Sequence, residues 1–221
     1  MSHSTEARAA LQPQLDAITE QTRRLVQPGR LEPAERAIAE SLQLETQIAQ
    51  PGQKLQHFAL PDATNRIISS DDVVALGPVV LKFFRGRWDP YCSTELEAWR
   101  ELYPDLRARG AFLLALSPQT IRQNDFLVGQ HSLPFPVLRD EKCAVATSLG
   151  LTHIAPDYLR QYYRSIMINI PFINGEDTWS LPLPASIVVD RNGIIRYAEA
   201  HANFRVRPEP ASTIAVLDSL Q

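Results

Sequence analysis

The stretch PVVLKFFRGRWDPYCSTELEAW, residues 78–99, decides the fold. Its first part is β-branched and aromatic, which predicts a mostly buried strand over 78–84. After a short turn, Asp89 and Pro90 are residues typical of a helix start, and the apolar residues that follow repeat at helical spacing. We expect a strand that leads directly into a helix, with Cys92 in the first turn of that helix.

Strands and helices alternate from about Phe58 onward. The helix after the motif should kink or break at Pro104. A second buried strand is expected over 111–116, and Ser117-Pro118 is a good opening for a helix that runs to about Val128. This β-α-β order implies a parallel sheet.

The C-terminal part adds an antiparallel pair. The apolar runs 185–190 and 193–200 flank Asn192-Gly193, a strong hairpin signal. A closing helix is expected over 208–220. The sequence therefore predicts an α/β fold with a central mixed sheet flanked by helices.

The first 50 residues have a different composition. Residues 5–27 and 33–49 are rich in Ala, Leu, Gln and Glu and show rough helical spacing. We interpret 1–50 as an N-terminal helical extension, with Pro28-Gly29 between its two helices, and 51–221 as the main domain. A solvated helical pair fits the pattern better than a partner-binding one, although the sequence leaves both open.

The composition excludes several classes of function. With 44% hydrophobic residues and a formal net charge of -3, neither nucleic acid nor an anionic membrane surface is an expected partner. The chain has no secretory pattern and no membrane-spanning run, so we expect a cytoplasmic protein. The five histidines lack metal-ligand spacing and no phosphate loop is present, so no metal or cofactor is expected.

Cys92 is one of two cysteines, and its predicted position favours reactivity. With Asp89 as N-cap and Pro90 first in the helix, the thiol lies at the third position, where the helix dipole lowers a thiol pKa. Arg85 and Arg87 add positive charge, whereas the Asp89 carboxylate opposes a thiolate. The sign of the net pKa shift stays open, and a buried, inert cysteine is the alternative.

Several motifs, in order, make residues 51–221 similar to the peroxiredoxin-like branch of the alkyl hydroperoxide reductase and thiol-specific antioxidant (AhpC/TSA) family. They are HFALPD (57–62), GPVVLKFFRGRWDPYC (77–92), ALSPQ (115–119), FPVLRDEKCAVATSLGL (135–151) and LPLPASIVVDRNGIIRYAEAHANFRVRPEP (181–210). The resemblance implies a thioredoxin-like fold and a thiol-dependent peroxidase. Such an enzyme reduces hydrogen peroxide or organic hydroperoxides through a cysteine sulfenic acid. Thioredoxin, glutathione or another thiol would restore the cysteine, and a homodimer is typical of the family.

The resemblance places Cys92 in the peroxidatic slot, because Glu95 and the threonine before it follow as they do in the family. The chain departs from the signature at three positions. The signature proline falls on Arg85, the substrate-binding threonine on Asp89, and the arginine near the end of a later strand on Pro184. Pro184 instead matches the cis-proline site of thioredoxins.

Asp89 also replaces the first cysteine of the W-C-P-Y-C motif common in this branch. If that first cysteine carries the chemistry, this chain is impaired; if the second carries it, as the resemblance implies, the chain is a one-cysteine enzyme. Cys143 is a candidate resolving cysteine, with a buried structural role as its alternative. Two other functions stay open: a thiol-disulfide oxidoreductase that acts through mixed disulfides, and a binding module without catalysis. The long segment 153–179 covers the active site or a partner surface, or has neither role.

Overall fold

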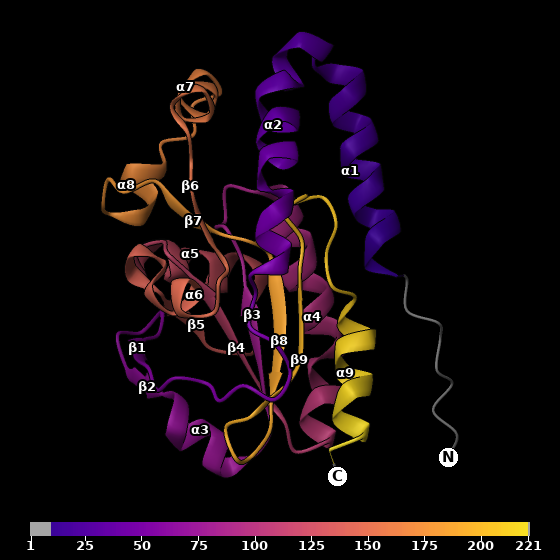
Figure 1. The fold of residues 1–221 in the computed structure, drawn as a ribbon, viewed down its shortest axis with the longest axis vertical. Helices are drawn as coiled ribbons and strands as arrows, with labels where there is room; N and C mark the ends of the chain where they lie inside the picture. Colours follow the sequence, from indigo (N-terminus) through magenta and orange to yellow (C-terminus); the bar gives the residue numbers. More distant parts are fainter. Residues whose placement is uncertain (1–9, 221) are drawn as a thin grey trace.

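A five-stranded mixed sheet lies at the centre of the protein (Figure 1). The computed structural model describes residues 10–220. The strands lie in the order β5-β4-β3-β8-β9, with bounds β5 (Val137–Arg139), β4 (Phe112–Ser117), β3 (Val79–Phe83), β8 (Ala185–Val189) and β9 (Ile195–Ala200). The strands β3, β4 and β5 are parallel, whereas β8 runs antiparallel to β3 and to β9. The predicted mixed sheet and the predicted hairpin are both confirmed.

The two faces of the sheet belong to different core clusters, because side chains alternate along a strand. Leu81 and Phe83 of β3 pack in the cluster that holds Cys143. Val80, and Phe84 just after the strand, pack in the cluster that holds Cys92. The two cysteines therefore lie on opposite sides of the sheet.

Helices cover both faces. The face with Cys92 packs against α4 (Pro90–Ala108), α5 (Ile121–His131) and α9 (Pro210–Asp218), and Figure 1 shows α4 and α9 side by side. The other face is covered by α3 (Ser70–Leu76), the 3-10 helix η2 (Glu141–Cys143), α6 (Ala144–Ser148) and the antiparallel pair β1 (Ala59–Pro61) and β2 (Ile67–Ser69).

The expected break at Pro104 and the expected start of the next helix were wrong, and a kink at Pro104 stays a prediction. The helix α4 continues through Pro104 because Trp99 and Leu106, both fully buried, hold it on the core on either side of the exposed proline. The helix α5 does not open at Ser117-Pro118, because the Ser117 carbonyl still accepts a sheet hydrogen bond from the Asp140 N–H. It opens after Thr120, whose side chain caps it.

The N-terminal part forms α1 (Leu11–Leu25) and α2 (Pro28–Ser41), followed by the 3-10 helix η1 (Leu42–Thr46). Figure 1 shows α1 and α2 as a helical hairpin that extends beyond one end of the sheet. The expected start of the first helix at residue 5 lies outside the described residues. The expected separator Pro28-Gly29 is instead the first turn of α2, since proline is well tolerated at the first helical position. The division of the chain at residue 50 stays a prediction.

The segment 153–179 is folded into α7 (Asp157–Ser165) and α8 (Ile170–Asn174), between the paired strands β6 (Thr152–Ile154) and β7 (Ser180–Pro182). The helix α7 lies against α2: the Tyr158 hydroxyl donates a hydrogen bond of 2.6 Å to Glu40, and the Arg36 guanidinium stacks over the Tyr158 ring. Among residues 10–220, no helix is long and apolar enough to cross a membrane.

Candidate active site

The turn between β3 and α4 has the predicted geometry. Gly86 has φ +149°, and a Cβ there would lie 2.7 Å from the Trp88 indole nitrogen, so the turn requires glycine. Asp89 is the N-cap of α4, and its Oδ1 accepts a hydrogen bond of 3.0 Å from the Tyr91 N–H. Pro90 is the first helical residue and Cys92 the third. The strand-turn-helix prediction for Cys92 is confirmed.

The Cys92 thiol is completely buried between a carboxylate and a guanidinium. Its Sγ donates a hydrogen bond to Asp89 Oδ2 over 3.2 Å and accepts one from Arg207 Nη2 over 3.4 Å. Arg207 Nη2 also lies 3.2 Å from Asp89 Oδ2, and Arg85 Nε lies 3.4 Å from the same oxygen. Two arginines and one carboxylate thus surround the sulfur.

Glu95, one helical turn after Cys92, extends this group into a buried ionic network. Its Oε2 accepts a hydrogen bond of 2.7 Å from Arg207 Nη1, and its Oε1 lies 2.5 Å from Lys82 Nζ. Lys82, Glu95 and Arg207 all have fully buried side chains. With Arg85 and Asp89 included, the network around the Cys92 thiol has three basic side chains and two carboxylates. They are Lys82, Arg85 and Arg207 on one side and Asp89 and Glu95 on the other.

Arg207 is the functional residue that sequence reasoning missed. It follows β9 and lies 115 positions after Cys92, so neither spacing nor periodicity connects the two. The only signal is its place in FRVRPEP (204–210), the end of a stretch already identified as similar to the family. Arg207 brings a guanidinium to the thiol although the position expected for the family arginine holds Pro184.

Burial decides the sign of the Cys92 pKa shift, which the sequence left open. It raises the pKa of the thiol to about 11. The positive charges of Arg207 and Arg85 lower the pKa and the carboxylate of Asp89 raises it further, but neither arginine outweighs the loss of water. The thiol is therefore protonated at neutral pH and needs a proton acceptor before it can react.

The predicted supporting arginines have different surroundings. Arg85 is buried, donates a hydrogen bond of 3.0 Å to the Tyr163 hydroxyl and packs between the rings of Trp88 and Phe204. Arg87 turns toward α5, where its Nε donates to Gln123 over 2.6 Å and its guanidinium stacks over Phe126. The described contacts of the Arg87 side chain thus lie on α5 and not at the thiol.

Pro184 lies between β7 and β8, where its carbonyl accepts a hydrogen bond from the His201 N–H. Residues 10–220 contain no cis peptide bond, so its match to the cis-proline of thioredoxins does not extend to peptide geometry. Cys143 is fully buried on the far face of the sheet, and burial raises the pKa of its thiol. The structure does not bring Cys143 to Cys92.

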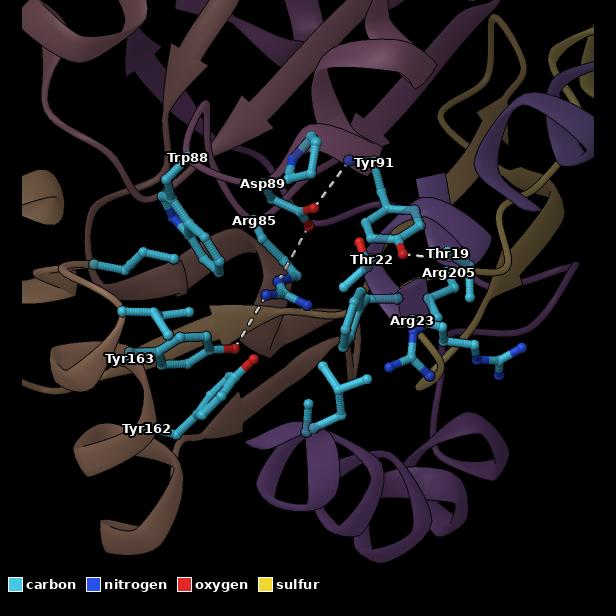
Figure 2. Close-up of a pocket in the computed structure, with 16 residues that line it drawn as sticks. Thr19, Thr22, Arg23, Arg85, Trp88, Asp89, Tyr91, Tyr162, Tyr163 and Arg205 are labelled. Atoms are coloured by element: carbon cyan, nitrogen blue, oxygen red, sulfur yellow. Dashed lines mark hydrogen bonds and ion pairs between the residues drawn. The ribbon is translucent and has the colours of Figure 1, made fainter. Parts of the chain in front are cut away.

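A pocket of about 160 Å³ opens beside the thiol (Figure 2). The turn residues Arg85, Trp88 and Asp89 form part of its wall, and Cys92 does not contribute to the lining. Asp89 therefore borders the pocket and also contacts the sulfur. Figure 2 shows Asp89, Arg85 and Tyr163 joined in one line of polar contacts.

The N-terminal helices and the segment 153–179 supply most of the rest of the pocket wall, and Pro90, Tyr91, Phe204 and Arg205 complete it. From α1, Leu11 and Leu15 pack against Tyr91, and the Thr19 hydroxyl lies 3.0 Å from the Tyr91 hydroxyl. The N-terminal helices thus pack on the motif through a few buried residues, while most of their side chains are at least partly exposed, and the choice between a solvated pair and a partner-binding one stays a prediction. The side chains of Tyr162 and Tyr163 show that the later segment covers the motif. No cluster of metal-ligating side chains occurs within the described part of the chain.

Known proteins are similar to this chain in sequence and in fold. A putative peroxiredoxin bcp of Coxiella burnetii is 27% identical over 45% of this chain, and a thiol-disulfide oxidoreductase ResA of Bacillus anthracis is 29% identical over 50%. The matches span 66% and 63% of these relatives' own lengths. The crystal structure of the peroxidoxin BcpB from Mycobacterium tuberculosis superimposes with a TM-score of 0.61 at 18% identity, over 78% of this chain and 99% of that one. It confirms the thioredoxin-like fold. Because the sequence pattern of the AhpC/TSA family matches residues 51–198, the chain belongs to the AhpC/TSA family.

Proposed function

We propose that the protein is a thiol-dependent peroxidase of the one-cysteine type, with Cys92 as its nucleophile. One observation carries the proposal: the thiol in the family's peroxidatic position is hydrogen-bonded to both a carboxylate and a guanidinium. Asp89 is placed to accept the thiol proton, and Arg207 to stabilise the thiolate that results. Membership of the AhpC/TSA family supports peroxide as the substrate.

The reaction balances with the groups present. Asp89 Oδ2 takes the thiol proton, the sulfur attacks one oxygen of the peroxide, and the O–O bond breaks. The leaving alkoxide or hydroxide takes the proton back from Asp89, which yields an alcohol or water and Cys92 sulfenic acid. A reducing thiol such as glutathione or thioredoxin then attacks the sulfenic sulfur and releases water, and a second thiol frees Cys92.

Access to the sulfur requires a side-chain movement. Since Asp89 lines the pocket and contacts the buried thiol, which does not line it, movement of the Asp89 carboxylate is the route that we propose for a peroxide from the pocket to the thiol. A carboxylate that moves toward the pocket after accepting the thiol proton carries that proton toward the leaving group. Opening of the path and proton transfer are then one movement.

The position of Cys143 supports the one-cysteine type. A disulfide requires Cα atoms about 4.4–6.8 Å apart, and the two cysteines belong to core clusters on opposite faces of the sheet. Asp89 at the first position of the motif excludes a CxxC disulfide. The reductant is therefore external to the described chain. A cytoplasmic setting and a homodimer stay predictions.

The direct test is mass spectrometry after one equivalent of peroxide, with a dimedone-type trap for sulfenic acid. We expect the adduct on Cys92 and none on Cys143. The similarity to ResA makes a thiol-disulfide oxidoreductase the second candidate. A stable mixed disulfide at Cys92 with negligible peroxide turnover would favour that candidate, and an unmodified Cys92 would contradict both.

Replacing Asp89 with asparagine separates two effects of the carboxylate on the thiol. Its charge raises the pKa of Cys92, and its oxygen is the proposed acceptor of the thiol proton. The N-cap is retained, because asparagine caps a helix about as well as aspartate. We expect the pKa of Cys92 to fall, since the Asp89 charge raises it. Peroxide turnover at neutral pH should nevertheless decrease about 100-fold, as for the loss of a general base. The measurements are the thiolate ultraviolet absorbance against pH, in a Cys143→Ala background, and stopped-flow peroxide reduction.

Glu97→Gln is the matched control, because Glu97 is a carboxylate on the same helix that pairs with His131 away from the thiol. It should leave the pKa of Cys92 and the turnover unchanged. Faster turnover of Asp89→Asn would show that Asp89 only suppresses the nucleophile, and would overturn its role as proton acceptor.

A further inference from the structure

The pocket beside the thiol has an apolar interior and an unpaired cation. Its wall is dominated by aromatic and aliphatic side chains, among them Trp88, Tyr162, Ile168 and Phe204. Figure 2 shows Arg23 and Arg205 together on one side, across from Trp88. Such a lining suits a ligand that has an apolar body and one negative charge.

The other two arginines in the wall each already contact a carboxylate. Arg205 pairs with Glu35 over 2.9 Å, and Arg85 contacts Asp89 over 3.4 Å. Arg23 has no ion pair or hydrogen bond from its side chain to any residue within 10–220. Its guanidinium is therefore free to bind an anion at the pocket.

The size of the pocket limits the apolar body. A cavity of about 150 Å³ holds one benzene molecule, and this pocket has about 160 Å³. One aromatic ring or one branched alkyl group fits beside Asp89, and any charged substituent must extend toward the exposed Arg23. A pocket of this volume excludes any ligand whose enclosed apolar part is much larger than one ring.

We propose that the pocket binds a small aryl or branched-alkyl hydroperoxide that carries a carboxylate. The apolar body packs on the aromatic wall, the carboxylate pairs with Arg23, and the hydroperoxide group faces Asp89. The placement of the hydroperoxide group at Asp89 rests on the proposed peroxidase function. The binding of an apolar carboxylate at Arg23 does not. Arg23 lies on α1, outside residues 51–198 that match the family, so this specificity comes from a part of the chain outside the family match.

Binding is tested with compounds that cannot react. The probes are 4-isopropylbenzoate and its uncharged counterpart 4-isopropylbenzamide, measured by isothermal titration calorimetry on the full chain. We expect the benzoate to bind about fivefold more tightly than the amide, as for a partly exposed ion pair. Arg23→Gln should abolish this preference. Arg24→Gln, its neighbour that pairs with Glu20 and does not line the pocket, should retain it.

The corresponding substrates separate this inference from the peroxidase proposal. We expect kcat/KM for 4-carboxycumene hydroperoxide to exceed that for cumene hydroperoxide about fivefold in the parent and not in Arg23→Gln. Preferred benzoate binding without peroxide turnover would overturn the peroxidase and retain the anion site. Equal binding of benzoate and amide, or a preference that survives Arg23→Gln, would overturn the anion site whatever the peroxidase activity.

Discussion

Replacing Cys92 with serine is expected to lower peroxide consumption at least about 1,000-fold, because a neutral hydroxyl does not attack the O–O bond as a thiolate does. Serine is close to cysteine in size and keeps a group that can donate to Asp89 and accept from Arg207. The fold should therefore survive, and circular dichroism checks that it does. The activity measurement is the initial rate of peroxide loss with a thiol reductant in excess.

Cys143→Ala is the matched control for this loss of activity. Cys143 is equally buried but lies on the other face of the sheet, so we expect its peroxide rate to stay within about twofold of the parent. It should lower stability slightly, as for any small cavity in a packed core. Unchanged peroxide consumption in Cys92→Ser would show that the proposed nucleophile is wrong. Loss of activity in Cys143→Ala with an intact fold would contradict the one-cysteine type.

The parts of the fold that the sequence predicted are those set by local pattern. The β-branched run of β3 and the Asn192-Gly193 hairpin were found because strand periodicity and turn chemistry act over a few residues. The break at Pro104 was wrong because packing of Trp99 and Leu106 outweighs the hydrogen bond that proline removes. Tertiary contacts of this kind are not visible in local sequence.

In the candidate site, too, the sequence predicted what depends on local spacing and missed what depends on contacts between distant residues. Asp89 and Cys92 were placed correctly, since the N-cap and third helical position follow from spacing alone. Arg207 and the pocket were missed, because each depends on residues far apart in the chain. The pKa of Cys92 could not be given a sign from sequence, because burial, its largest cause, is a property of the whole fold.

Arg207→Met is expected to cost about 3–5 kcal/mol of folding free energy, the penalty for removing one partner of a buried ion pair. The loss leaves Glu95 with Lys82 alone and leaves Asp89 without its second guanidinium, both with fully or almost fully buried side chains. Methionine keeps much of the volume, so the cost arises from charge more than from a cavity. Urea unfolding followed by tryptophan fluorescence measures it.

Two further variants identify charge as the cause. Arg207 contacts two carboxylates, and Arg109→Met removes a guanidinium that likewise makes two carboxylate contacts, both with Asp218 at the exposed surface, so it should cost no more than about 1 kcal/mol. Adding Glu95→Gln to Arg207→Met should lower the stability further, since it leaves the buried Lys82 ammonium without its carboxylate partner. If Arg207→Met is no less stable than Arg109→Met, the buried network does not hold the thiol in place. The account of Cys92 as a sulfur positioned between Asp89 and Arg207 would then fail, even in a protein that still reduces peroxide.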